Sequence, residues 1–120
     1  MYNVLFVCYG NICRSPMAEM IFKNLIYKNS KKYLINCESM ATSMEELGND
    51  IYPNAKKKLE EMSIPVERHV ARQFKKSDYE KYDFIIVFEE RNKRDLINII
   101  GEDVDNKIHL ILEYTDSLQS

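Results

Sequence analysis

The residues of this sequence whose types and spacing suggest chemistry are Cys8 and Arg14, which lie six positions apart. A cysteine thiolate is a nucleophile, and an arginine guanidinium matches two oxygens of a phosphate group in a planar, bidentate geometry. Together they predict attack by sulfur on the phosphorus of a bound phosphate ester. Taken alone, the pair has another interpretation, in which Cys8 is a buried cysteine at a strand end and Arg14 is a surface charge.

The residues around this pair favour a phosphate-binding loop. The apolar residues 4–7 predict a buried strand, and Ser15 followed by Pro16 predicts a helix start with Ser15 as its N-cap. A loop between a strand and a helix N-terminus directs backbone N–H groups and the positive end of the helix dipole at an anion. The predicted phosphate-binding residues are Tyr9, Gly10, Asn11, Ile12, Cys13, Arg14 and Ser15.

In this setting the Cys8 thiolate is expected to attack phosphorus in line and form a cysteinyl-phosphate, which divides hydrolysis into two steps. The loop amides and the Arg14 guanidinium are expected to stabilise the equatorial oxygens as charge spreads over them in the transition state. The Ser15 hydroxyl is expected to form a hydrogen bond with the thiolate.

Composition limits the class of protein. A chain of 120 residues that is 45% apolar and 30% charged is expected to form one globular domain, residues 1–120. The net charge of −2 gives no electrostatic basis for binding nucleic acid, and the apolar runs are too short to span a membrane. Three unclustered cysteines predict neither a disulfide framework nor a zinc site, and no metal or organic cofactor is implied. A reactive thiol and the lack of a signal peptide favour a cytoplasmic location.

The order of predicted elements indicates an α/β fold. Strands are predicted at residues 4–7, 33–37, 84–88 and 107–112. Helices are predicted at residues 16–28 and 91–100. A further helix is predicted to start at Pro53, with Ala55, Leu59 and Met62 facing inward. Residues 38–52 are expected to form a long loop, and residues 75–81 a charged connector with one helical turn.

Alternation of buried strands with amphipathic helices predicts a three-layer α/β/α domain around a four-stranded parallel sheet, of the flavodoxin-like kind. The phosphate-binding loop would join the first strand to the first helix. Ligands of such sheets bind at the carboxyl ends of the strands, which is where the loop after Cys8 begins. The expected fold and the expected site therefore agree.

Residues 4–19 read Val-Leu-Phe-Val-Cys-Tyr-Gly-Asn-Ile-Cys-Arg-Ser-Pro-Met-Ala-Glu. This stretch resembles the signature of the low-molecular-weight protein tyrosine phosphatases. The resemblance continues through residues 38–43, 69–73 and 82–85, with Asn92 and residues 94–96, and covers almost the whole chain.

The resemblance implies roles for several residues. Cys8 would be the nucleophile and Arg14 the phosphate clamp. A buried hydrogen-bond network that shapes the loop would comprise Asn11, Ser15, Ser39 and His69. Cys13 matches a cysteine that in the family forms a reversible disulfide with the nucleophile and protects it from over-oxidation.

The sequence also departs from the family pattern. The family's general acid is an aspartate in an Asp-Pro-aromatic motif, which this sequence does not contain. No general acid is therefore identified; Asp116 is a candidate, and its other interpretation is a solvated residue of the tail. The sequence also has no stretch that matches the family's last helix, so we expect an apolar patch on one face of the sheet. Such a patch predicts a homodimer or reduced stability. Glu45 replaces a family aromatic residue and should disfavour anionic peptides, whereas Tyr9 is expected to supply an aromatic wall.

Three functions remain open from the sequence. The first is hydrolysis of phosphotyrosine-type aryl phosphate monoesters, attenuated by the absent acid, with a phosphorylated protein or a small aryl phosphate as substrate and inorganic phosphate as product. The second is a non-catalytic module that binds phosphate or a phosphopeptide. The third is arsenate reduction, for which further cysteines must relay a disulfide, and Cys37 in a predicted strand is poorly suited to that task.

Overall fold

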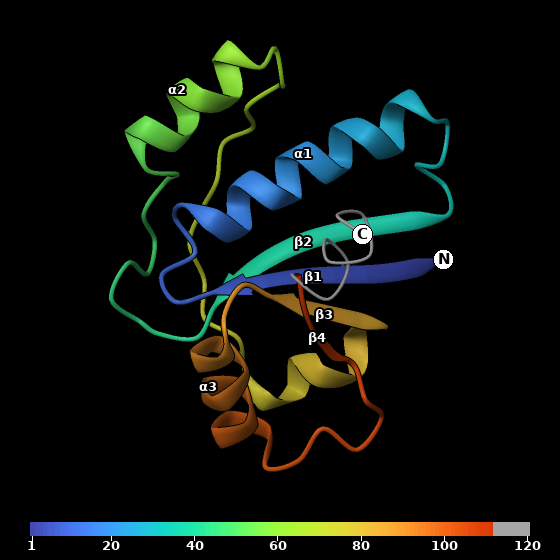
Figure 1. Ribbon diagram of the computed structural model, residues 1–120, viewed down its shortest axis with the longest axis vertical. Helices are drawn as coiled ribbons and strands as arrows, with labels where there is room; N and C mark the ends of the chain where they lie inside the picture. Colours follow the sequence, from blue (N-terminus) through green and yellow to red (C-terminus); the bar gives the residue numbers. More distant parts are fainter. Residues whose placement is uncertain (112–120) are drawn as a thin grey trace, which may run out of the picture.

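The computed structural model describes residues 1–111, in which strands and helices alternate (Figure 1). In chain order the elements are β1 (Tyr2–Cys8), α1 (Arg14–Lys28), β2 (Ile35–Ala41), α2 (Pro53–Glu61), the 3₁₀ helix η1 (Lys76–Lys81), β3 (Phe84–Val87), α3 (Glu90–Ile100) and β4 (Ile108–Leu110). Within the described residues, no helix combines the length and apolarity needed to cross a lipid bilayer.

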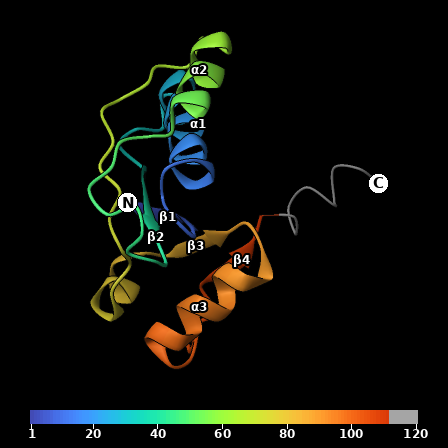
Figure 2. The same cartoon turned by 90° about the vertical axis from the view of Figure 1, so that its left-hand side faces the viewer.

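The strands of the described residues form one parallel sheet in the order β2-β1-β3-β4. Two views show α1 and α2 on one side of the sheet and η1 and α3 on the other (Figures 1 and 2). This arrangement confirms the predicted parallel sheet between two helical layers. Since β1 lies between β2 and β3, the loop that follows Cys8 opens at the carboxyl edge of the sheet, next to the end of β2.

The core lies on both faces of β1 because successive strand residues point to opposite faces. Leu5 and Val7 pack in a buried cluster with residues of β3, η1 and α3. Val4 and Phe6 belong to a second cluster, on the face that α1 covers. A third cluster around Leu59 joins α1 to α2. The central strand is therefore fixed by packing from both sides, and the position of its last residue is fixed with it.

The prediction that residues 38–52 form one long loop is wrong at its start. β2 begins at Ile35, later than predicted, and continues to Ala41, so Ser39 lies on a strand. Each residue of β2 pairs with one of β1, up to the pair of Ala41 with Cys8. This pairing overrides the weak strand preference of the polar residues 38 and 39, because strand formation depends mainly on cross-strand neighbours.

Two details of the predicted helices also need correction. α1 begins at Arg14 with Cys13 as its N-cap residue, so Ser15 is inside the helix and does not cap it. Met62 is the C-cap residue of α2 and is 48% exposed rather than facing inward. The helix ends one residue before Met62, which turns that side chain away from the buried face that carries Ala55.

An apolar groove of about 600 Å³ lies on the sheet face beside α1. Its lining residues are Tyr2, Val4, Phe6, Phe22, Ile35, Phe84, Ile86 and Ile111. Tyr2 and Phe84 are 61% and 40% exposed, with ring centroids 6.4 Å apart. Among the described residues, this groove corresponds to the apolar patch that the sequence analysis expects on one sheet face.

Asp103 fixes the start of β4. Its carboxylate accepts hydrogen bonds from the Tyr79 hydroxyl at 2.5 Å and from the backbone N–H groups of Lys107 and Ile108 at 2.8 and 3.0 Å. Burial of Asp103 opposes its charge, but these three hydrogen bonds outweigh burial and hold the pKa of Asp103 below its ordinary value. Burial and the Asp103 carboxylate together raise the pKa of Tyr79 to about 12.

We expect Asp103→Asn to weaken the acid dependence of stability. Because the pKa of Asp103 is lower in the folded than in the unfolded chain, its contribution to the unfolding free energy is present above about pH 4 and is lost as the pH falls through the folded pKa. Urea unfolding between pH 7 and pH 2.5 checks this, with Asp105→Asn as the matched control. Equal acid dependence in the wild type and Asp103→Asn would contradict the assignment.

Candidate active site

The segment after β2 holds the start of the loop between β1 and α1. The backbone carbonyls of Cys8 and Tyr9 accept hydrogen bonds at 3.0 Å from the backbone N–H groups of Thr42 and Ser43, respectively. The Ser43 hydroxyl donates a second hydrogen bond to the Tyr9 carbonyl at 2.8 Å. These bonds fix the chain at the point where Cys8, the buried last residue of β1, meets the loop.

Two polar groups converge on the Cys8 sulfur. The Asn11 backbone N–H donates to Sγ at 3.3 Å, and the Ser15 Oγ lies 3.0 Å from it. The Ser15 oxygen itself accepts a hydrogen bond from Asn11 Nδ2 at 2.8 Å. Its hydroxyl proton can be donated to the sulfur or to the Met40 carbonyl, which lies farther away at 3.5 Å. Donors aimed at sulfur stabilise negative charge on it, and the thiolate is the nucleophilic form of cysteine. The structure thus brings Ser15 and Cys8 together as the sequence predicts.

Asn11 is the centre of a buried hydrogen-bond network. It is fully buried and has a left-handed backbone conformation with φ of 59°. Its Nδ2 donates to the Ser39 hydroxyl at 2.9 Å, its Oδ1 accepts from the Arg72 backbone N–H at 3.2 Å, and its carbonyl oxygen lies 2.5 Å from His69 Nε2. A left-handed residue with a side chain costs roughly 1–2 kcal/mol, and these bonds offset that cost.

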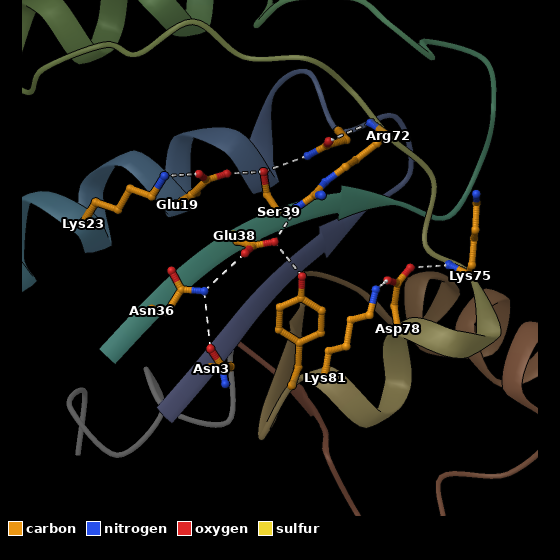
Figure 3. Close-up of polar contacts among 12 residues, drawn as sticks. Asn3, Glu19, Lys23, Asn36, Glu38, Ser39, Arg72, Lys75, Asp78 and Lys81 are labelled. Atoms are coloured by element: carbon orange, nitrogen blue, oxygen red, sulfur yellow. Dashed lines mark hydrogen bonds and ion pairs between the residues drawn. The ribbon is translucent and has the colours of Figure 1, made fainter. Parts of the chain in front are cut away.

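A charged pair on α1 extends this network, and sequence reasoning missed it (Figure 3). The Ser39 hydroxyl donates to Glu19 at 2.5 Å, and Glu19 pairs with Lys23 at 2.6 Å. Ser15, Glu19 and Lys23 follow one another at four-residue spacing and so share one helix face. That spacing is the signal from which Glu19 could have been predicted as a neighbour of the loop.

Arg14 lies at the rim of the loop, at the first position of α1. Its side chain is 44% exposed, and Nη2 lies 3.5 Å from the Glu89 carboxylate. The guanidinium carbon also lies 5.7 Å from the centroid of the Phe88 ring. Because an exposed ion pair contributes at most about 1 kcal/mol, the guanidinium can exchange Glu89 for a bound anion.

The other predicted loop residues occupy distinct places. The Tyr9 hydroxyl donates to Glu45 at 2.8 Å. Gly10 sits against the segment after β2, since a Cβ added there would lie 3.3 Å from the Glu46 side chain. Cys13 is exposed, in contrast to the buried nucleophile candidate. The loop is thus closely packed on one side and open at the rim.

Two further residues that the sequence singles out are Asp116 and Cys37. Asp116 falls outside the described residues. Cys37 is on β2 and only 2% exposed, and burial, with a smaller contribution from Glu19, raises the pKa of its thiol.

The fold and the site define a class of protein: a parallel α/β domain with a cysteine at the carboxyl end of a central strand and an arginine at the start of the helix that follows it. A family model described as low molecular weight phosphotyrosine protein phosphatase matches residues 3–120. The chain belongs to this family, which confirms the resemblance found in the sequence.

Individual relatives agree with the family assignment. The low molecular weight phosphotyrosine protein phosphatase of Homo sapiens is 42% identical over 94 residues, which are 78% of this chain and 59% of that protein. The corresponding protein of Gallus gallus is 36% identical over 119 residues, 98% of this chain and 75% of that protein. The crystal structure of YfkJ from Bacillus subtilis matches with a TM-score of 0.91 and 34% identity over 95% of this chain and 72% of that one. The chain thus spans 59% to 75% of the length of these relatives.

We expect Asn11→Ala to lower the free energy of unfolding by about 2–5 kcal/mol, because it combines left-handed strain with the loss of buried hydrogen bonds. Asn106→Ala is the matched control, since Asn106 is also left-handed, with φ of 51°, but is exposed. That control should lose only about 1–2 kcal/mol. Urea unfolding of both variants measures the difference, and equal losses would show that the Asn11 network contributes nothing.

Proposed function

We propose that this chain hydrolyses aryl phosphate monoesters of the phosphotyrosine type, with Cys8 as nucleophile and Arg14 as phosphate clamp. The observation that carries the proposal is the convergence of the Ser15 hydroxyl and the Asn11 N–H on the Cys8 sulfur, at 3.0 and 3.3 Å. Membership of a phosphatase family supports it. Ser39 and His69 would act indirectly, by holding Asn11 in the conformation that directs its N–H at the sulfur.

The chemistry has two displacements at phosphorus. The Cys8 thiolate forms the sulfur–phosphorus bond as the bond to the aryl oxygen breaks, and that oxygen leaves with the electron pair and takes up a proton. Water then attacks phosphorus, breaks the sulfur–phosphorus bond and releases inorganic phosphate and the thiolate. Arg14 and the N–H groups of Tyr9, Gly10, Asn11, Ile12, Cys13 and Ser15 would stabilise the phosphoryl oxygens. One such donor is worth roughly 100- to 1000-fold in rate.

The proposed activity is limited by the lack of an identified general acid that would donate a proton to the leaving oxygen. Glu45 and Glu89 are carboxylates in contact with loop side chains, but they accept hydrogen bonds from Tyr9 and Arg14. The sequence contains no Asp-Pro motif. The proposed activity is therefore attenuated toward esters with poor leaving groups, since general acid catalysis contributes roughly 100- to 10,000-fold.

A leaving-group series tests the proposal. Nitrophenyl phosphate should be hydrolysed by the wild type and by Cys37→Ala but not by Cys8→Ser. The rate should fall steeply as the leaving-group pKa rises, so that phosphotyrosine reacts roughly 100- to 10,000-fold more slowly than an activated ester. A flat dependence that becomes steep in Asp116→Asn would instead identify Asp116 as the acid. Phosphate binding without turnover of either ester would refute the hydrolase and support the phosphate-binding module.

Arsenate reduction is less well supported than phosphate ester hydrolysis. It needs a second reactive thiol to relay the disulfide away from the nucleophile. Cys37 is only 2% exposed, and burial raises the pKa of its thiol, so it is a weak nucleophile in the folded protein.

Cys13 is proposed to protect the nucleophile by forming a disulfide with it. Peroxide would oxidise the Cys8 thiolate to a sulfenic acid, and the exposed Cys13 thiol would displace water from it to form the disulfide. After peroxide treatment, a thiol reductant should restore activity to the wild type but not to Cys13→Ser. Full recovery of Cys13→Ser would contradict this role.

A further inference from the structure

Arg72 lies beside the end of β2, an edge strand of the described sheet, and makes contacts on both faces of that sheet. Its carbonyl accepts a hydrogen bond from the Ala41 N–H at 2.7 Å, and its own backbone N–H donates to Asn11 Oδ1 at 3.2 Å. Its guanidinium pairs with the Glu38 carboxylate (Figure 3). Glu38 pairs with Leu5 in the sheet register and so lies on the face that η1 covers. Arg72 therefore joins the network of the loop to a carboxylate on the opposite face.

Glu38 is fixed by two further donors. The Tyr82 hydroxyl donates at 2.6 Å to the carboxylate oxygen that pairs with Arg72, and Asn36 Nδ2 donates to the other oxygen at 3.2 Å. Burial opposes the charge of Glu38, but the three donors outweigh burial and hold its pKa below the ordinary value. Burial and the Glu38 carboxylate raise the pKa of Tyr82, which keeps its hydroxyl protonated. Since Tyr82 belongs to the buried core, it ties the Glu38 carboxylate to that core.

The Arg72 N–H determines which way the side-chain amide of Asn11 points. A backbone N–H can only donate, so the amide oxygen must face it, and the amide nitrogen is directed at the hydroxyls of Ser15 and Ser39. In the opposite orientation, the amide oxygen would compete with the Cys8 sulfur for the Ser15 proton. In the observed orientation, the Ser15 oxygen accepts from Asn11, and its proton is available to the sulfur.

The ion pair of Arg72 adds a constraint that the backbone contacts leave open. The hydrogen bond from Ala41 fixes the peptide group that follows Arg72, not the one whose N–H enters the loop network. The latter peptide group is held at the Ala71 carbonyl by the N–H of Gly48 at 2.8 Å, and Gly48 is exposed. The bond to Glu38 thus connects Arg72 to the packed core.

We infer that Arg72, anchored by Glu38 and Tyr82, is a positioning residue that keeps a hydrogen-bond donor directed at the nucleophile. This inference rests on the proposed function, in which Cys8 is the nucleophile, and deepens it by naming residues that act on the sulfur from a distance. Arg72 acts through Asn11 and Ser15. Because every residue but proline carries a backbone N–H, the side chain contributes by holding that N–H in place.

Alkylation of Cys8 by iodoacetamide, followed by mass spectrometry from about pH 5 to about pH 9, tests this inference without turnover. Arg72→Met should lower the rate near pH 6 about 2- to 10-fold, the equivalent of one net hydrogen bond, because the thiol ionises less readily. The rates of the variant and the wild type should converge at alkaline pH, where the thiol is ionised in both. Arg68→Met is the matched control, since it removes the charge of an exposed arginine from the same segment.

Tyr82→Phe is a second variant, which removes one hydroxyl and no charge. It should lower the rate near pH 6 about 2-fold or more, whereas Tyr33→Phe, at an exposed tyrosine, should not change it. Arg72→Lys keeps the charge that pairs with Glu38 and should recover part of the rate lost in Arg72→Met.

Two results would overturn the inference. One is an unchanged pH profile in both Arg72→Met and Tyr82→Phe. The other is a rate lowered by the same factor at every pH, because that would show altered access to the sulfur and not altered ionisation of the thiol. A protein that shows the expected pH profiles but hydrolyses no ester would refute the proposed function while supporting the positioning role of Arg72.

Discussion

The candidate site depends on the left-handed conformation of Asn11. With φ of 59°, this residue directs its backbone N–H at the Cys8 sulfur and its carbonyl toward His69. Its side chain is also held by hydrogen bonds, because Nδ2 donates to both Ser15 and Ser39. One unfavourable backbone conformation is thus maintained by a set of buried hydrogen bonds, and the same residue and its partner Ser15 contact the sulfur.

The register between β1 and β2 supplies the part of this network that lies far away in the sequence. Ser39 pairs with Phe6, and paired residues of neighbouring strands point to the same face of a sheet. Phe6 faces α1, so Ser39 does too, and there it meets Asn11 and Glu19. A shift of one residue in this register would turn Ser39 to the opposite face and leave Asn11 with one donor unpaired.

Local signals in the sequence were sufficient to predict the strand, the loop and the helix that carry the site. They failed where a tertiary contact decides the outcome. Ser15 before a proline is typical of a helix cap, but its hydroxyl is used by Cys8 and Asn11 inside the helix. Glu38 and Ser39 are polar, and they join a strand only because β1 lies beside them. The contact of Arg91 with Tyr9 links segments about eighty residues apart, and no spacing in the sequence indicates it.

The buried network and the rim differ in their sensitivity to ionic strength. The bonds around Asn11 join mostly neutral groups that are shielded from solvent, and dissolved salt does not screen them. The pair of Arg14 with Glu89 joins side chains that are 44% and 46% exposed, which is the setting in which salt weakens attraction. Raising the salt concentration would therefore loosen the entrance of the site while leaving the surroundings of the sulfur intact. In the proposed activity, capture of an anion and reactivity of the thiol would therefore depend on physically separate groups at the two ends of the loop.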